Sequence, residues 1–220
     1  MGGLPTDGGA LITTAGAIGG SSWLTIDSFN TGLHSGWTGD TGDFGPETST
    51  VYEGSGAVRA DTNANFCDID SYPGDGLPHY FELGEEARIY TYRDEPSVFQ
   101  LQFAGSSDGN NFWRLRNDVA NGETTLDQMT SGTGSEVASV GTVPPESTWI
   151  ETRIKRFDDN THSTGEIRLT QTRLDTSNTL VDITATEAEL TNYAGLRIIW
   201  ENHGSKSDLS IIDGLAKRVI

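Results

Sequence analysis

The chain has 220 residues, which is enough for one large domain or two small ones with a sizeable core. It carries 32 Asp and Glu against 14 Lys and Arg, so its formal net charge is −18. This charge excludes nucleic acid as a natural partner, because phosphate contacts need clustered Lys and Arg, and it disfavours an anionic membrane surface. Such acidity is typical of proteins that work in high salt, where screening weakens self-repulsion, so we expect a halophilic source.

The first segment, residues 1–22, is rich in glycine and differs from the rest of the chain. It has apolar residues but no basic start, since Arg59 is the first basic residue, and it therefore does not resemble a secretory signal. No apolar run reaches the roughly 18–20 residues of a membrane span, so no membrane insertion is expected. We expect 1–22 to be an anchoring or inter-subunit arm and 23–220 to be one domain.

From Trp23 onward, short alternating segments are separated by clusters of Gly, Asn, Asp and Pro, a pattern that predicts strands and turns. The segments expected to form strands are 22–26, 50–53, 56–61, 78–83, 87–93, 97–104, 111–117, 123–130, 136–140, 148–157, 165–174, 179–184, 194–201 and 208–219. Only 185–191 has a helical composition, over one or two turns. The chain is therefore predicted to be all-β, a two-sheet antiparallel jelly-roll β-sandwich with a Gly-rich N-terminal arm.

The alternation also predicts which side of each strand is buried. Phe99, Leu101 and Phe103 share one side of their strand. In the segment 148–157, Ile150 and Ile154 are expected to face the core. The opposite side of each strand is polar and is available to solvent or to a ligand.

Five segments carry a resemblance to a known family. They are Asp27-Ser28-Phe29-Asn30 with Ser35-Gly36-Trp37, the hairpin Tyr52–Arg59, the run Phe112–Asn117, Trp149-Ile150-Glu151, and Ile211–Leu215. Their order and spacing resemble concanavalin A-like (laminin G-like) jelly rolls over residues 23–220. The resemblance implies binding of glycans or proteins, sometimes with calcium, while a minority of such domains are glycosidases. Similar acidic modules occur in haloarchaeal surface proteins and in virion proteins of haloarchaeal tailed viruses.

Catalytic patterns are missing from the sequence. The E-x-D-x-x-E strand motif of glucanases with this fold is absent, and Glu151, Arg153 and Lys155 alternate acid with base as in cross-strand pairing. The G-x-S-x-G at 105–109 joins two expected strands, so it is interpreted as a hairpin loop and not as a nucleophile elbow. The histidines lack zinc spacing. We expect no catalytic residues and no enzyme; a glycan-active hydrolase of the same fold is the alternative.

Calcium is the one candidate cofactor, because it needs only clustered loop oxygens. Three groups of acidic residues are candidates: Asp68, Asp70 and Asp75; Asp27 with Asp208 or Asp213; and Asp158-Asp159-Asn160. The second group would meet if the first and last strands pair, which resembles the terminal calcium site of some carbohydrate-binding jelly rolls. The alternative is that an acidic protein simply has Asp in its loops.

Most arginines fall in the later predicted strands, several of them beside aromatic residues. Arginine and aromatic side chains on one sheet face are typical of sugar or protein binding. The residues expected to form a ligand or interface surface are Tyr90, Tyr92, Arg114, Arg116, Trp149, Arg153, Arg168 and Arg197. Two alternatives stay open, namely a self-paired ladder of Arg and Glu, and a subunit interface.

These expectations combine into one functional hypothesis. The chain is predicted to be a non-catalytic structural or adhesion module on the surface of a halophilic virion, as a capsid turret, decoration or tail-fibre protein. Its expected partners are copies of itself, other capsid or tail proteins, and a host-surface glycan or glycoprotein. A carbohydrate-binding protein on the surface or outside of a halophilic cell is the alternative.

Overall fold

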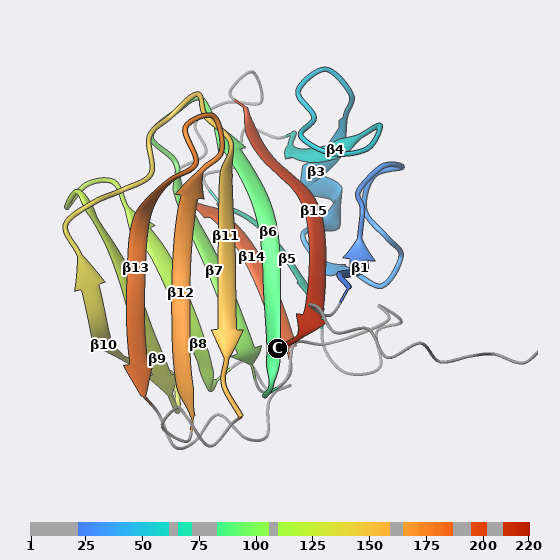
Figure 1. The fold of residues 1–220 in the computed structure, drawn as a ribbon. Coiled ribbons are helices and arrows are strands. Elements are labelled where there is room, and N and C mark those ends of the chain that lie inside the picture. Colours follow the sequence, from blue (N-terminus) through green and yellow to red (C-terminus); the bar gives the residue numbers. More distant parts are fainter. Residues whose placement is uncertain are drawn as a thin grey trace, which may run out of the picture.

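The computed structural model describes residues 22–61, 66–71, 83–105, 110–158, 165–186, 195–201 and 209–220. In these ranges two antiparallel sheets pack face to face, and the only helical element is a 3-10 turn, η1 (Thr41–Asp43) (Figure 1). The predicted all-β jelly-roll sandwich is confirmed. In the part of the chain that is described, no helix has the length and apolarity needed to cross a membrane.

One sheet has eight strands. Its order is β13 (Asn178–Thr186), β12 (Glu166–Arg173), β11 (Ile150–Arg156), β6 (Glu85–Arg93), β15 (Ser210–Val219), β4 (Ala57–Ala60) and β3 (Phe44–Glu47), with β1 (Leu24–Asp27) also pairing with β15. The first and last described strands are therefore neighbours, as the sequence analysis supposed for its terminal calcium site.

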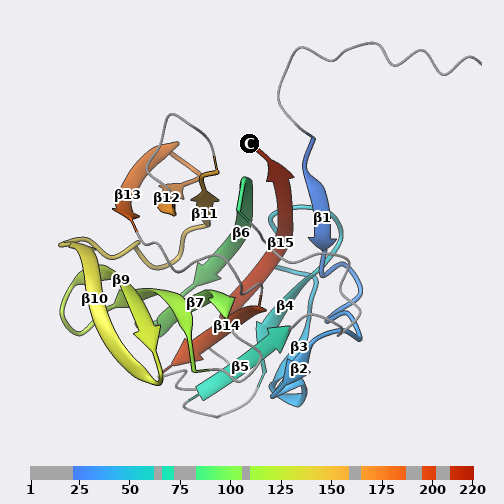
Figure 2. The ribbon, with the colours of Figure 1, turned by 90° about the horizontal axis from the view of Figure 1, so that it is seen from below.

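The other sheet has seven strands. Its order is β10 (Thr133–Val140), β9 (Glu123–Thr130), β8 (Phe112–Asp118), β7 (Val98–Gly105), β14 (Gly195–Glu201), β5 (Phe66–Ser71) and β2 (Thr38–Gly39). Figure 2 shows the two sheets as separate layers, with the edge strands β10 and β13 in contact at one side.

Most predicted strands are present, with three differences. Residues 50–53 form a loop and not a strand, so that prediction was wrong. The short strands β2 and β3 and the strand β5 were not predicted, because they contain glycine, proline or alternating acids that depress strand propensity. The expected short helix at 185–191 does not begin where it was predicted, because Ala185 and Thr186 are the last residues of strand β13. Residues 1–21, 78–82 and 187–191 lie outside the described residues.

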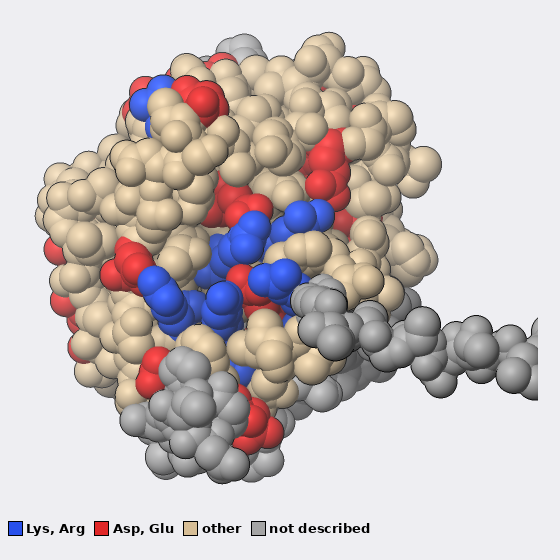
Figure 3. Space-filling model, in the orientation of Figure 1, with Lys and Arg blue, Asp and Glu red and all other residues tan. Residues whose placement is uncertain are grey.

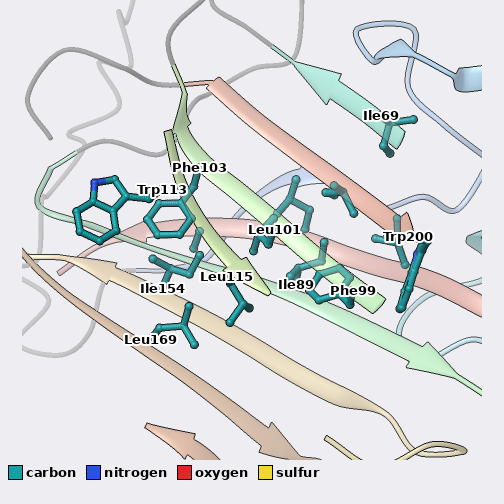
Figure 4. Packing of buried hydrophobic residues seen from close by; sticks show 14 of the residues in the cluster. Ile69, Ile89, Phe99, Leu101, Phe103, Trp113, Leu115, Ile154, Leu169 and Trp200 are labelled. Atoms are coloured by element: carbon teal, nitrogen blue, oxygen red, sulfur yellow. The ribbon is translucent and has the colours of Figure 1, made fainter. Parts of the chain in front are cut away.

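The core lies between the sheets and follows the predicted alternation. Phe99, Leu101 and Phe103 of β7 are buried and point toward the eight-stranded sheet, where Ile154 and Leu169 face them (Figure 4). Burying each such side chain stabilises the fold by about 1.5–3 kcal/mol. The face assignment for these strands is confirmed.

A buried polar bridge joins the two sheets. Asn117 of β8 donates through Nδ2 to Gln171 Oε1 at 2.8 Å and to Thr124 Oγ1 at 2.9 Å, and Gln171 of β12 donates back to Asn117 Oδ1 at 3.2 Å. Gln171 Nε2 also donates to Thr152 Oγ1 at 3.2 Å. Because each amide has a buried partner, the bridge fixes how the sheets align without leaving unsatisfied groups.

Candidate functional site

The structure divides the eight predicted ligand or interface residues between two opposite surfaces. Tyr90, Tyr92, Trp149, Arg153 and Arg168 belong to strands β6, β11 and β12 or precede them, on the outer face of the eight-stranded sheet. Arg114, Arg116 and Arg197 lie on strands β8 and β14, on the outer face of the seven-stranded sheet. The core separates these two faces, so the eight residues do not form one surface.

Aromatic rings cluster on the outer face of the eight-stranded sheet, and we call Tyr52, Tyr90, Tyr92 and Trp149 the aromatic platform. The ring centroids of Tyr52 and Tyr90 lie 4.4 Å apart, and Trp149 lies 5.7 Å from Tyr52 and 5.5 Å from Tyr92. Tyr52 is 43 % exposed while Tyr90 beneath it is buried, and this burial raises the pKa of Tyr90. The platform therefore has a buried base and an open upper surface.

The loop that carries Tyr52 is held from below by Asp213 of β15. Asp213 Oδ2 accepts the backbone N–H of Tyr52 at 2.8 Å and that of Glu53 at 2.9 Å. Burial raises the pKa of Asp213 above its ordinary value, although the hydrogen bonds from these two N–H groups act to lower this pKa. The same loop is also hydrogen-bonded to Asn30, whose Oδ1 accepts the backbone N–H of Ser55 at 2.6 Å and that of Gly56 at 3.1 Å. The position of Tyr52 is thus fixed by residues distant in the sequence.

Beside the platform lies a hollow of about 330 Å³, which we call the basic depression. It is lined by Glu86, Glu151, Arg153, Lys155, Arg168, Thr170, Thr172 and Thr179 of strands β6, β11, β12 and β13. Figure 3 shows Lys and Arg side chains gathered in the middle of this face. The gathering is notable because the whole chain has only 14 Lys and Arg.

One buried carboxylate organises the cations of the basic depression. Glu86 is fully buried, and its Oε1 lies 3.8 Å from a guanidinium nitrogen of Arg153 and 3.8 Å from Lys155 Nζ. Its Oε2 accepts from Arg218 Nε at 2.6 Å. Glu151 binds Arg153 with both carboxylate oxygens, and the side-chain hydrogen bond to Glu151 is the main cause of the raised pKa of Arg153.

Trp23, just before β1, packs against the same cations. Its ring lies 4.6 Å from the guanidinium carbon of Arg218, 4.7 Å from that of Arg88 and 5.6 Å from that of Arg153. Such cation–π contacts hold guanidinium groups in place while leaving them charged. Trp23 thus covers one side of the group formed by Arg88, Arg153 and Arg218.

The outer face of the seven-stranded sheet has a different charge pattern. Arg114 faces Asp127 in the strand register and donates to its Oδ2 from Nε at 2.9 Å and from a terminal nitrogen at 2.7 Å. Arg116 pairs with Asp118 and lies 3.8 Å from Glu201. These arginines are neutralised by acids, as in the self-paired ladder that the sequence left open.

The predicted calcium ligands are only partly described. Asp75 and Asp208 lie outside the described residues, as does the side chain of Asp68, and Asp70 accepts the hydroxyl of Thr38. Asp27 accepts N–H groups of Phe29, His34 and Trp37, separately from Asp213 and its loop. Among the residues that can be described, no group of three or more His, Cys, Asp or Glu could hold a metal ion. Calcium binding stays a prediction.

Three residues of this surface were missed by the sequence analysis. The sequence predicts Tyr52 within a strand at 50–53 and Trp23 within a strand at 22–26, and Glu86 falls just before the predicted strand 87–93. Their roles depend on contacts with Asp213, Arg153 and Arg218, which are far away in the chain. The available signs of the basic depression were the acid–base alternation of β11 and the arginines that share strand faces with aromatic residues, from which Arg153 and Arg168 were predicted.

No family model matches the sequence, and no curated protein matches it. The fold is similar to solved structures. The exoplasmic/lumenal domain of VIP36 in its Ca2+-bound form superposes with a TM-score of 0.58 at 12% identity, covering 89% of this chain and 90% of that one. A legume lectin-like domain from Entamoeba histolytica superposes with a TM-score of 0.52 at 11% identity, covering 81% and 90%. These likenesses show the concanavalin A-like jelly-roll fold.

Proposed function

We propose that this chain is a non-catalytic glycan-binding module whose ligand lies on the outer face of the eight-stranded sheet. The observation that carries the proposal is the aromatic platform, with its exposed Tyr52 and its tilted Trp149, directly beside a polar hollow. Ligand sites combine apolar and aromatic surface with a few placed polar groups, and this face supplies both. The similar fold of VIP36, solved in a Ca2+/Man2-bound form, supports a sugar ligand.

The buried carboxylates of this face, Glu86, Glu151 and Asp213, support binding and not hydrolysis. A glycosidase needs two carboxyl groups that reach the scissile bond, one of them with a raised pKa. Glu86 and Glu151 are both held in ion pairs with Arg153. Burial raises the pKa of Asp213, but its side chain is enclosed beneath the Tyr52 loop and cannot reach a glycosidic oxygen.

The test is binding to an immobilised glycan panel with three purified variants. We expect Trp149→Ala and Tyr52→Ala to weaken binding of any glycan retained by the wild type at least about tenfold, because each removes stacking area. Phe112→Ala is the matched control. Phe112 lies on the same side of β8 as Arg114, and therefore on the outer face of the seven-stranded sheet, away from the proposed ligand. Equal binding by all three variants, or no retention of any glycan by the wild type, would contradict the proposal.

We further propose that this module lies on the surface of a halophilic virion. There it forms a homo-oligomer that contacts capsid or tail proteins and a host glycan. The net charge of −18 and the resemblance to acidic virion modules support this setting. Its test is mass spectrometry of purified particles together with light scattering in molar salt. A monomer that is absent from particles would contradict it.

Calcium is the proposed cofactor, at Asp27 with Asp208 or Asp213, or at Asp68, Asp70 and Asp75. At Asp27 and Asp213, a cation would compete with the N–H donors from which these carboxylates already accept hydrogen bonds. We expect added Ca2+ to raise the melting temperature and EDTA to lower it. An unchanged melting temperature under both conditions would contradict the cofactor.

A further inference from the structure

Within the proposed function, we infer that the glycan is acidic: a sugar carboxylate or sulfate occupies the basic depression while a neighbouring sugar stacks on the aromatic platform. This inference rests on the proposed function and adds the chemical class of the ligand. Both anions present paired oxygens that fit the planar fork of a guanidinium group.

The first support is the strand register, which sets like charges opposite each other. Arg153 of β11 lies directly across from Arg88 of β6, and Lys155 of β11 lies directly across from Arg168 of β12. Like charges in directly opposed positions destabilise a sheet. Nearby acids offset this repulsion, since Lys155 also lies directly across from Glu86 and Arg153 is bound by Glu151. The gathering of these cations on one part of a chain with 32 acidic residues nevertheless points to a use.

The second support is the exposure of the charged groups. The side chains of Arg153 and Lys155 are each 35% exposed and that of Arg168 is 48% exposed, whereas Glu86 is fully buried and Glu151 is 9% exposed. A solute in the depression therefore meets three cations, with Glu86 and Glu151 beneath them and the exposed carboxylate of Asp182 beside Arg168 at the rim. The three lining cations outnumber the two lining carboxylates, so the lining carries a positive formal charge although the whole molecule is acidic.

The third support is that two of the cations are already oriented. Glu151 and Glu86 fix Arg153, and Asp182 fixes Arg168 through two hydrogen bonds of 2.9 and 2.6 Å. Threonines 170, 172 and 179 add hydroxyl groups along the wall. Because the arginine side chains are held before binding, less side-chain entropy is lost when an anion arrives.

The spacing along β11 sets the length of the ligand. Trp149, Glu151, Arg153 and Lys155 follow one another on the same side, with Trp149 immediately before the strand. Six residues at the strand rise of about 3.3 Å separate the backbone of Trp149 from that of Lys155 by about 20 Å. A ligand that contacts both ends is longer than a single sugar, so the ligand class is an acidic oligosaccharide or polysaccharide.

The test compares polygalacturonate, dextran sulfate and neutral dextran as soluble probes for the full chain, at about 0.1 M NaCl, where the Debye length is about 10 Å. We expect the wild type to bind at least one polyanion and to prefer it to dextran at least tenfold. The two polyanions distinguish a carboxylate from a sulfate as the recognised group. A protein of net charge −18 that lacked a basic site would be repelled by both.

The decisive variants carry equal changes in charge on opposite faces. We expect Lys155→Gln/Arg168→Gln to weaken polyanion binding at least about tenfold, and Arg114→Gln/Arg116→Gln to leave it unchanged. Thermal melting of each variant reports whether it folds. Equal loss in both double variants, no loss in either, or equal affinity of the wild type for dextran and the polyanions would overturn the inference. If the wild type binds dextran and Trp149→Ala loses that binding, the proposed function stands even when the inference of an acidic ligand fails. If the wild type binds neither dextran, nor the polyanions, nor any glycan of the panel, the inference and the proposed function are both overturned.

Discussion

The two outer faces of the sandwich use the same residue types in different ways. On the seven-stranded sheet, Arg114 is directly opposite Asp127 and Arg197 is directly opposite Asp70. On the eight-stranded sheet, Arg153 is opposite Arg88, and one buried acid, Glu86, serves several cations. On the first face Arg114 and Arg116 each pair with an acid of their own, whereas on the second the cations gather around the shared Glu86, and Arg153 and Arg168 also bind Glu151 and Asp182. The faces therefore differ in how their acids are shared: on the eight-stranded sheet one buried carboxylate serves several cations, and two of these, Lys155 and Arg218, lie directly opposite it in the strand register.

The largest expected effect comes from removing the acid that the cations share. Glu86→Gln should lower the free energy of unfolding by about 3–5 kcal/mol, because it leaves Arg153, Lys155 and Arg218 clustered around an uncharged buried group. Denaturant unfolding measures this effect. The matched change on the other face, Asp127→Asn, should cost about 1.5–3 kcal/mol, since it breaks one partly exposed pair. Equal losses of unfolding free energy in Glu86→Gln and Asp127→Asn would contradict the difference between the two faces.

An intermediate effect is expected at the support of the aromatic platform. Asp213→Ala should lower the free energy of unfolding by about 1–3 kcal/mol, because two backbone N–H groups of the Tyr52 loop lose their acceptor. It should also weaken glycan binding, because Tyr52 is then no longer held on Tyr90. Full binding by a folded Asp213→Ala variant would show that the loop position does not matter.

The pH dependence at Asp213 follows from the direction of its shift. Burial raises the pKa of this carboxyl in the folded protein, so the folded state holds its proton more tightly than the unfolded chain does. Its contribution to stability is complete below the ordinary carboxyl pKa of about 3.9 and is lost as the pH rises through the higher folded-state value. The stability of the wild type relative to Asp213→Asn should therefore fall as the pH rises above about 3.9 and through the raised folded-state pKa. A difference that is flat with pH would contradict this role.

The smallest expected effect is at the exposed rim of the basic depression. Asp182→Asn should lower the free energy of unfolding by less than about 1 kcal/mol, because the pair with Arg168 is about half exposed and is screened by solvent. The hydrogen bond from Arg168 lowers the pKa of Asp182, so this contribution is present above about pH 3.9 and is lost as the pH falls through the lowered value. In molar NaCl the effect should vanish, while the effect of Glu86→Gln should persist because Glu86 is buried.

The fold could be predicted from the sequence because burial in strands has a period of two. Phe99, Leu101 and Phe103 alternate with polar residues, and this local pattern determines both the strand and its buried side. Strand β3 was missed because Gly45 and Pro46 lower its propensity, and it forms only by pairing with β4. Local patterns therefore predicted the central strands and failed for strands that depend on a partner.

The site could be predicted only in part. Trp149 and Arg153 were identified because they alternate with apolar residues on one strand. Arg114 was grouped with them although it lies on the opposite face, because nothing local in the sequence tells which of two sheets a strand joins. Tyr52 was missed because its position depends on Asp213, which lies 161 residues further along the chain. Pairing between distant segments, and not composition, creates the candidate binding face.

The central claim is that a glycan lies on the face that carries Trp149. Nuclear magnetic resonance of the tryptophan indole N–H groups tests it directly, since Trp149 lies on this face while Trp113 and Trp200 are buried in the core. On addition of a bound glycan, we expect the Trp149 signal to shift in proportion to occupancy and the signals of Trp113 and Trp200 to stay in place. A bound glycan that leaves Trp149 unchanged and shifts the backbone signals of strand β8 around Arg114 would contradict the claim.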